Sequence, residues 1–398
     1  MKPLLDSLAA RLAAGDPNLT VLVYATGMLV FCGVVLMGFV APYAGVTSFI
    51  ERRIAARMQS RVGPNRVGPQ GIIQWVADGL KCILKEDLIP EEADKALFRI
   101  APYLVFIGMF GTFVVIPFGS SLVISDLDVG LFYLLAITSL VSVGLIMAGW
   151  ASNNKWSLLG GMRSAAQIVS YEIPSGLSLL AVVLFAGSMS VQGVIRSQGW
   201  APHTWLVFQN PFLFASYFIF FTAALAEGNR TPFDIPEAES ELVAGYNTEY
   251  SGMRFALFFL AEWANLYVIG AVSAAAFLGG WQVPPAIPPA VRPVAELLVF
   301  VAKATFGVFL AIWARWTFPR LRVDQMMEVC WKYLVPLSFL NIVGTAVWMI
   351  LFPKGALTAV AVSVVMVLVA LAVLALFVRK VAMNLRSSDG AISLNPFV

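Results

Sequence analysis

The chain has 398 residues, of which 59% are hydrophobic and only 12% are charged, and its formal net charge is +3. Soluble domains carry about 25% charged residues, so this composition excludes an ordinary soluble fold, and the small net charge gives no indication of nucleic-acid binding. The apolar runs are continuous rather than alternating, which predicts spanning helices instead of a barrel. We therefore expect an all-α polytopic membrane protein.

Apolar runs long enough to cross about 30 Å of hydrocarbon, at about 20 helical residues each, occur about nine times. They fall near residues 20–48, 100–121, 129–151, 172–192, 210–227, 255–280, 294–314, 333–352 and 357–378. Lysine and arginine are concentrated in the odd-numbered loops and the C-terminal tail. The positive-inside rule therefore predicts an N-terminus outside and a C-terminus in the cytoplasm. The large polar segments then share the cytoplasmic side; they are 51–99, 152–171, 228–254 and 315–332.

The first polar segment combines basic residues with a helical pattern. Arg52 and Arg61 belong to its run of arginines, and two Gly-Pro pairs stiffen it because proline fixes φ. Over residues 70–86, apolar positions recur at helical spacing with Asp78 and Lys81 between them, which predicts an interfacial amphipathic helix. The segment is either a positive-inside anchor with a surface helix or one wall of a chamber for an amphiphilic ligand.

Three ionisable groups lie in or beside later spans. Glu172 leads into the fourth span, where a carboxylate at a helix start is favoured by the helix dipole. Glu262 lies within the sixth span and Lys303 within the seventh. Ionisable groups at membrane depth are functional by default, so we expect a role for Glu262 and Lys303. The alternative for these two residues is a structural ion pair or a hydrogen-bonded plug.

A cluster of carboxylates follows the fifth span, and only Arg230 and Arg254 stand nearby to balance it. Pro232 and Pro236 prevent a continuous helix there. Closely spaced carboxylates at an apolar boundary titrate as a coupled set, which points to proton handling; the alternative is a solvated acidic loop. The six carboxylates of this acidic segment are Glu227, Asp234, Glu237, Glu239, Glu241 and Glu249.

Arginines also follow the seventh span. Arg315 and Arg320 lie there, on the predicted cytoplasmic side. Positive-inside anchoring accounts for them by itself. Because they share a side with the acidic segment, they are also natural counter-charges for it.

Few residues could carry electrons or hold a metal. The chain has three cysteines, far apart in sequence, and one histidine. An iron–sulfur cluster normally needs four cysteines in grouped spacing, and a bis-histidine haem needs two histidines. We therefore expect no cofactor and no metal bound by this chain, so any electrons in its reaction must come from a partner.

The motifs in these polar segments are similar to those of one family, and the similarity covers nearly the whole chain. The most specific ones are Glu51-Arg52-Arg53, Ser170-Tyr171-Glu172, Ala261-Glu262-Trp263-Ala264-Asn265 and Pro319-Arg320-Leu321-Arg322-Val323-Asp324-Gln325. They resemble the H (NuoH-type) membrane subunit of respiratory complex I, the proton-pumping NADH–quinone oxidoreductase. One departure is Gly228, which stands where the family usually has a threonine.

The resemblance implies an architecture and a set of partners. It implies a single membrane domain over 1–398, with an eight-helix core over 20–352 and an additional C-terminal helix over 357–378, in a bacterial cytoplasmic membrane. The subunit would have no redox centre and no catalytic residue of its own. Its partners would be the subunit with the terminal iron–sulfur cluster, that subunit's large neighbour, the small membrane subunits and the antiporter-like subunits. Quinone would be the substrate, and NADH, FMN and the iron–sulfur clusters would reside in partner subunits.

The resemblance also implies roles for individual residues. The quinone chamber and its entrance would be lined by Arg52, Arg61, Asp78 and Lys81. Coupling of quinone reduction to proton translocation would run through Glu172, Glu227, Arg230, Asp234, Glu237, Glu239, Glu241, Glu249 and Glu262, with Arg315 and Arg320 as counter-charges. The alternatives are the equivalent subunit of a membrane-bound hydrogenase-type complex and a stand-alone secondary transporter, whose duplicated halves are not visible in the sequence.

Overall fold

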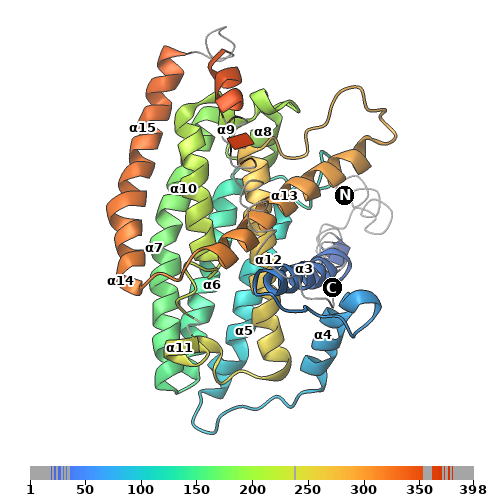
Figure 1. The fold of residues 1–398 in the computed structure, drawn as a ribbon, viewed down its shortest axis with the longest axis vertical. Coiled ribbons are helices and arrows are strands. Elements are labelled where there is room, and N and C mark those ends of the chain that lie inside the picture. The colour runs from blue at the N-terminus through green and yellow to red at the C-terminus, as the bar shows by residue number, and fades with distance from the viewer. Residues whose placement is uncertain are drawn as a thin grey trace, which may run out of the picture.

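Figure 1 shows the chain as a computed structural model. It describes residues 36–236, 239–352 and 361–369, together with scattered positions within 19–33 and 372–379. Every regular element in this part of the chain is a helix, which confirms the all-α prediction. Six described helices are long and apolar enough to cross a membrane, and this confirms the prediction of a polytopic membrane protein.

The long helices follow the apolar runs in order. They are α5 (Lys95–Gly111), α6 (Gly130–Ala151), α7 (Lys155–Ala186), α10 (Pro211–Glu227), α12 (Gly252–Phe277), α13 (Arg292–Thr317) and α15 (Val335–Leu351). The first predicted run is described continuously only from η1 (Leu36–Val40) into α3 (Ala41–Met58). Most of the ninth run, 357–378, lies outside the described residues.

Short helices complete the fold. They are η2 (Pro69–Gly71), α4 (Gln74–Leu84), η3 (Thr112–Val114), α8 (Val191–Arg196), η4 (Pro202–Thr204), α9 (Leu206–Gln209), α11 (Glu239–Leu242), η5 (Gly245–Asn247), α14 (Val323–Glu328) and η6 (Val329–Leu334). Because α14, η6 and α15 follow one another without a break, they form one apolar stretch. The predicted loop over 315–332 therefore becomes helical ten residues before the expected start at 333.

The fourth span begins much earlier than the sequence predicts. The segment 152–171 is not a loop, because α7 begins at Lys155, where the Asn154 side chain accepts a hydrogen bond from the Trp156 backbone N–H at 2.9 Å. Gly160 allows this extension to pack closely, since a Cβ there would lie 2.7 Å from the Cα of Gly245. Glu172 therefore lies well inside a helix, and the interpretation that it sits at a helix start is wrong.

The helices form an upright bundle (Figure 1). α5, α6, α7, α10 and α12 run along its long axis, α15 packs against α7 and α10, and α13 crosses obliquely beside α12. α8 and α9 lie at one end of the bundle, called the α8 end below, and α11 lies towards the other, called the α11 end. The acidic segment lies at the α11 end because it connects α10 with α12.

An aromatic block fills the bundle next to the α8 end. The ring of Tyr267 on α12 lies 5.2 Å from Phe39, 4.8 Å from Tyr43 and 5.9 Å from Phe113, measured between ring centroids. Phe300 on α13 joins the block through Phe118, at 6.0 Å. Tyr267 and Phe300 are almost completely buried, so the block forms a continuous apolar region beyond Glu262 along α12.

The helix predicted within residues 70–86 is present as α4. Its apolar side chains remain exposed in the isolated chain; Leu84 is 85% and Ile83 is 63% exposed. This is the pattern of an amphipathic helix that lies against a membrane surface or a partner. The interfacial position of α4 stays a prediction.

Candidate functional site

The predicted residues of the first polar segment partly assemble around α4. The Arg52 Nη1 atom lies 2.7 Å from an Asp78 oxygen, and Lys81 Nζ lies 3.9 Å from the other oxygen of the same carboxylate. Gln74, one turn before Asp78, donates to it at 3.0 Å. Arg61 does not join this group, because its Nε donates to Gln59 at 2.7 Å.

Close packing of α4 on α3 makes this group possible. Trp75 on α4 lies against Gly45 on α3, and a Cβ at position 45 would meet the indole ring at 2.3 Å. Only glycine permits this approach without a shift of the tryptophan. The ion pair between Arg52 and Asp78 therefore joins two helices that already touch.

A second ion pair joins α3 to α13, and one of its members was missed by the sequence analysis. Arg315 Nη1 lies 2.8 Å from Glu51 Oε1. Glu51 is only 5% exposed, and its Oε2 is buried without a hydrogen-bond partner among the described residues. Arg315, predicted as a counter-charge of the acidic segment, therefore pairs with a different carboxylate. Glu51 belongs to the Glu51-Arg52-Arg53 motif, but no sequence pattern identifies so distant a partner.

Arg320 does pair with the acidic segment. Its Nη2 lies 3.1 Å from Asp234 Oδ2, and the backbone N–H of Leu321 donates to the Pro232 carbonyl at 3.0 Å. The second Asp234 oxygen is buried without a hydrogen-bond partner within the described ranges. The connection between α13 and α14 thus lies directly on the acidic segment.

Glu262 on α12 faces Arg230 rather than Lys303. The Arg230 Nη2 atom lies 3.2 Å from Glu262 Oε1, and the guanidinium lies 4.7 Å from the centroid of the Trp263 ring. Arg230 is 4% and Glu262 18% exposed, measured on the side chains. Lys303 instead donates to the Leu278 carbonyl at 2.7 Å at the end of α12, which fits the hydrogen-bonded plug considered from the sequence.

Two small adjoining cavities lie beside the carboxylates of Glu172, Glu227 and Glu262. One, of about 20 Å³, is lined by residues that include Glu227, Glu262 and Asn265. The other, of about 10 Å³, is lined by residues that include Glu172, Glu227, Asn265 and Thr138. One water molecule needs a cavity volume of roughly 10–15 Å³, so the first cavity has room for one water molecule. Glu227 lines both, and its Oε1 is buried without a hydrogen-bond partner in the described part of the chain.

The remaining carboxylates of the acidic segment lie towards its C-terminal half. Glu241 pairs with Arg163 of α7 at 2.6 Å, with its side chain 58% exposed. Glu249 accepts a hydrogen bond from the Asn154 side chain at 2.6 Å. Glu237 lies outside the described residues, and only the backbone of Glu239, in α11, is described.

A buried glutamine holds the start of the acidic segment in place. Gln167 on α7 is 0% exposed, and its Nε2 donates to the carbonyls of Ala226 at 2.8 Å and Phe233 at 2.6 Å. It therefore fixes the two ends of the turn that carries Arg230. Gln167 had no role predicted from the sequence, because it falls in the segment 152–171 that was expected to be a loop.

The site is a chain of charged and hydrogen-bonding side chains. Among the described residues, no group of three or more histidine, cysteine, aspartate or glutamate side chains could hold a metal ion. The arrangement can hold, orient and exchange protons, and it can stabilise a polar or anionic group brought to α3 and α4.

Comparisons with known proteins agree with the motifs. The model of the NADH dehydrogenase family matches residues 30–346. The H subunit of NADH-quinone oxidoreductase from Anaeromyxobacter dehalogenans is 54% identical over 82% of this chain and 83% of its own length. The proteins of the same name from Chlorobium luteolum and Chlorobaculum tepidum are 48% and 47% identical over 82% of this chain, and over 90% and 94% of their own lengths.

Proposed function

We propose a function from one premise: the chain belongs to the NADH dehydrogenase family and is a membrane subunit of NADH-quinone oxidoreductase, respiratory complex I. Other complex I subunits are therefore its partners, and it acts as part of an enzyme. The proposal is that this subunit forms the quinone chamber together with peripheral-arm subunits. It then couples quinone reduction to proton translocation through a chain of carboxylates.

The ion pairs of α3 support the chamber part of the proposal. Arg52–Asp78 and Glu51–Arg315 use neighbouring residues of one helix to hold α4 and α13 around it. Such a wall offers charged groups to the polar head of a quinone and apolar helix faces to its tail. The terminal iron–sulfur subunit and its large neighbour would complete the chamber and deliver electrons, with NADH, FMN and the clusters bound in partner subunits.

The cavities support the coupling part, and they are the observation that carries it. Glu262 and Glu227 both line the first, and Glu227 and Glu172 both line the second, with apolar side chains such as Met109 and Val141 and the polar Asn265 completing both linings. Quinone reduction consumes protons and passes through anionic forms, which changes the field at Asp234 and Arg230. Because close carboxylates titrate together, a proton gained or lost at one shifts the others. Thr138 and Asn265 provide the polar groups that a bridging water would need.

The positive-inside pattern gives the proposed complex its orientation. The polar segment 228–254 lies at the α11 end, and it contacts the first polar segment through Arg254–Asp87 and the stretch before α14 through Asp234–Arg320. We place this end on the cytoplasmic side of a bacterial inner membrane, where the peripheral arm would dock. The N-terminus would then lie outside and the C-terminus inside.

The test replaces Glu227 by Gln in the complete complex. Glutamine keeps the shape of the side chain but can neither release nor take up a proton at neutral pH, so coupled NADH–quinone turnover should fall by about tenfold or more. NADH oxidation by a soluble artificial acceptor, which bypasses quinone, should be unchanged. Glu91→Gln, at an exposed position, is the matched control. Normal coupled turnover in an assembled Glu227→Gln complex would overturn the proposal.

A further inference from the structure

An ion pair outside the predicted site joins the end of α4 to the start of α12. Arg254 Nη2, in the first turn of α12, lies 3.0 Å from Asp87 Oδ2, just beyond the end of α4. Its side chain is 14% exposed, whereas that of Asp87 is 39% exposed. We call residues 85–88 and 251–254 together the α4–α12 clamp.

Backbone contacts close the clamp independently of the ion pair. The Ser251 hydroxyl donates to the Glu86 carbonyl at 3.0 Å and accepts from the Leu88 N–H at 3.2 Å. Gly252 has a φ of +58°, and a Cβ there would lie 3.0 Å from the Lys85 carbonyl oxygen. The backbone of residues 85–88 is therefore in direct contact with the backbone of residues 251–252. The C-terminal end of α4 cannot move far without moving the start of α12.

An aromatic pair fixes the α12 side of the clamp. The Phe98 and Tyr250 rings stack at 4.0 Å, and the Tyr250 hydroxyl donates to the Phe98 carbonyl at 3.2 Å. Burial raises the pKa of Tyr250 well above its usual range, so the hydroxyl stays protonated and remains a donor. The Arg254 guanidinium lies 5.7 Å from the Phe98 ring centroid, which limits where its side chain can move.

The clamp connects the two parts of the proposed machinery. On one side, α4 carries Asp78 and Lys81, which form the ion-pair group with Arg52. On the other, α12 carries Glu262 two turns beyond Arg254, so a shift at the start of the helix reaches Glu262 through a continuous hydrogen-bonded backbone. The clamp is also separate from the cavities, since neither Asp87 nor Arg254 lines them.

We propose that Asp87 and Arg254 are positioning residues that transmit a displacement of α4, caused by quinone in the chamber, to Glu262 on α12. The inference rests on the proposed function, which it deepens by naming a mechanical link between chamber and carboxylates. Neither residue exchanges a proton in the reaction. Their contribution is to keep the two helices moving together.

The experiment uses the complete complex in sealed proteoliposomes with Asp87→Asn, Arg254→Gln, the double variant, and the charge-swapped pair Asp87→Arg with Arg254→Asp. Protons moved per quinone reduced are measured beside kcat and KM for quinone, with a soluble artificial acceptor as the check of integrity. Each neutral variant should lower the proton-to-quinone ratio, or coupled kcat, by about fivefold. The double variant should lose no more than either single one, and the swapped pair should recover at least about half of the wild-type value.

Several results would overturn the inference. They are wild-type coupling in Asp87→Asn, additive losses in the double variant, or no recovery in an assembled charge-swapped complex. Because Asp87 is 39% exposed, its variant requires no repacking and decides the matter if Arg254→Gln fails to assemble. Glu227→Gln is measured in parallel. If it abolishes coupling while Asp87→Asn is normal, only the clamp fails; if it couples normally, the proposed carboxylate route fails instead.

Discussion

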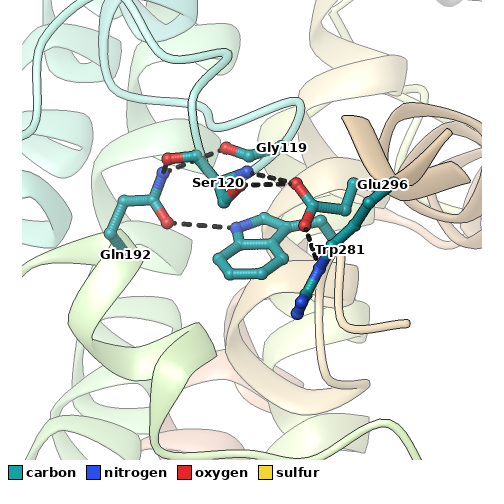
Figure 2. A network of polar contacts seen from close by, with 6 residues as sticks. Gly119, Ser120, Gln192, Trp281 and Glu296 are labelled. Atoms are coloured by element: carbon teal, nitrogen blue, oxygen red, sulfur yellow. Dashed lines mark hydrogen bonds and ion pairs between the residues drawn. The ribbon is translucent and has the colours of Figure 1, made fainter. Parts of the chain in front are cut away.

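The two ends of the bundle both bury carboxylates, but they treat them differently. At the α8 end, Glu296 is 1% exposed, and its Oε2 accepts from the Ser120 N–H at 2.8 Å and the Ser120 hydroxyl at 2.7 Å. Its other oxygen pairs with Arg292 at 3.2 Å. Figure 2 shows this network continuing beside it, where Gln192 donates to Gly119 and accepts from the Trp281 indole at 3.1 Å.

At the α11 end, several carboxylates have one oxygen that accepts no hydrogen bond among the described residues. Glu51, Glu227 and Asp234 each have one buried oxygen without a hydrogen-bond partner among the described residues. Such atoms are costly and are rare in finished cores, whereas a fully bonded network is rigid. Burial alone therefore does not mark a functional acid. Both oxygens of Glu296 have hydrogen-bond partners, so this carboxylate is held in one position. Glu51, Glu227 and Asp234 at the α11 end each have an oxygen that can still accept a hydrogen bond from a new partner or a water, or take up a proton.

The largest expected effect comes from disrupting the hydrogen bonds of Glu296 at the α8 end. Replacing Glu296 by Ala removes the acceptor of Arg292 and of the two Ser120 donors, and the loss of hydrogen bonds to a charged group costs about 1.5–3 kcal/mol, although Arg292, 46% exposed, can return to water. We expect a marked fall in assembled complex and an earlier thermal dissociation. The surviving complexes should reduce quinone at a nearly normal rate per molecule. Wild-type thermal stability for Glu296→Ala, with the exposed Glu91→Ala as control, would contradict the structural role.

The second prediction applies one substitution to both ends. Glu262→Gln removes a proton-exchanging group beside the first cavity and weakens the pair with Arg230, so coupled quinone turnover should fall by about tenfold. Glu296→Gln keeps an oxygen that can still accept from Ser120, so turnover should change by less than about twofold. Rates are compared per assembled complex. Equal losses in the two variants would remove the functional distinction between the ends.

The sequence predicted the fold, and it also named the candidate site residues, because apolar runs and clusters of charge are local patterns. Apolar runs located the long helices α5, α6, α7, α10, α12, α13 and α15, and the density of charge identified the acidic segment and the arginines that follow α13. The segment 152–171 was misjudged because Lys155, Arg163 and its asparagines suggested a loop. Its packing depends instead on glycines such as Gly161, whose Cβ would lie 3.0 Å from the Leu145 carbonyl. Hydropathy does not register that kind of contact.

Pairing between distant residues could not be read from the chain. Arg315 was expected to face the acidic segment, because both belong to the predicted cytoplasmic side, yet it pairs with Glu51 at the far end of the sequence. Lys303 and Glu262 lie in neighbouring spans, but α13 crosses α12 obliquely and directs Lys303 to the α12 terminus. The crossing angle of two helices, and the position of each side chain along the bundle axis, determine which residues pair. Neither can be read from the spacing of residues within one helix.

The smallest effects should come from the two ion-paired carboxylates of the acidic segment, Asp234 and Glu241, and should decrease as their exposure increases. Asp234 is 16% exposed and pairs with Arg320, whereas Glu241 is 58% exposed and pairs with Arg163. Exposed ion pairs contribute about 0–1 kcal/mol and weaken further with salt. In the assembled complex, Asp234→Ala should therefore slow coupled turnover by about threefold to fivefold, and Glu241→Ala by less than about twofold. The quinone reductase rate of both variants, measured at low and high salt, checks the order. A larger loss at Glu241 than at Asp234 would show that Glu241 is covered in the complex, and normal turnover in both would count against the acidic segment as part of the coupling route.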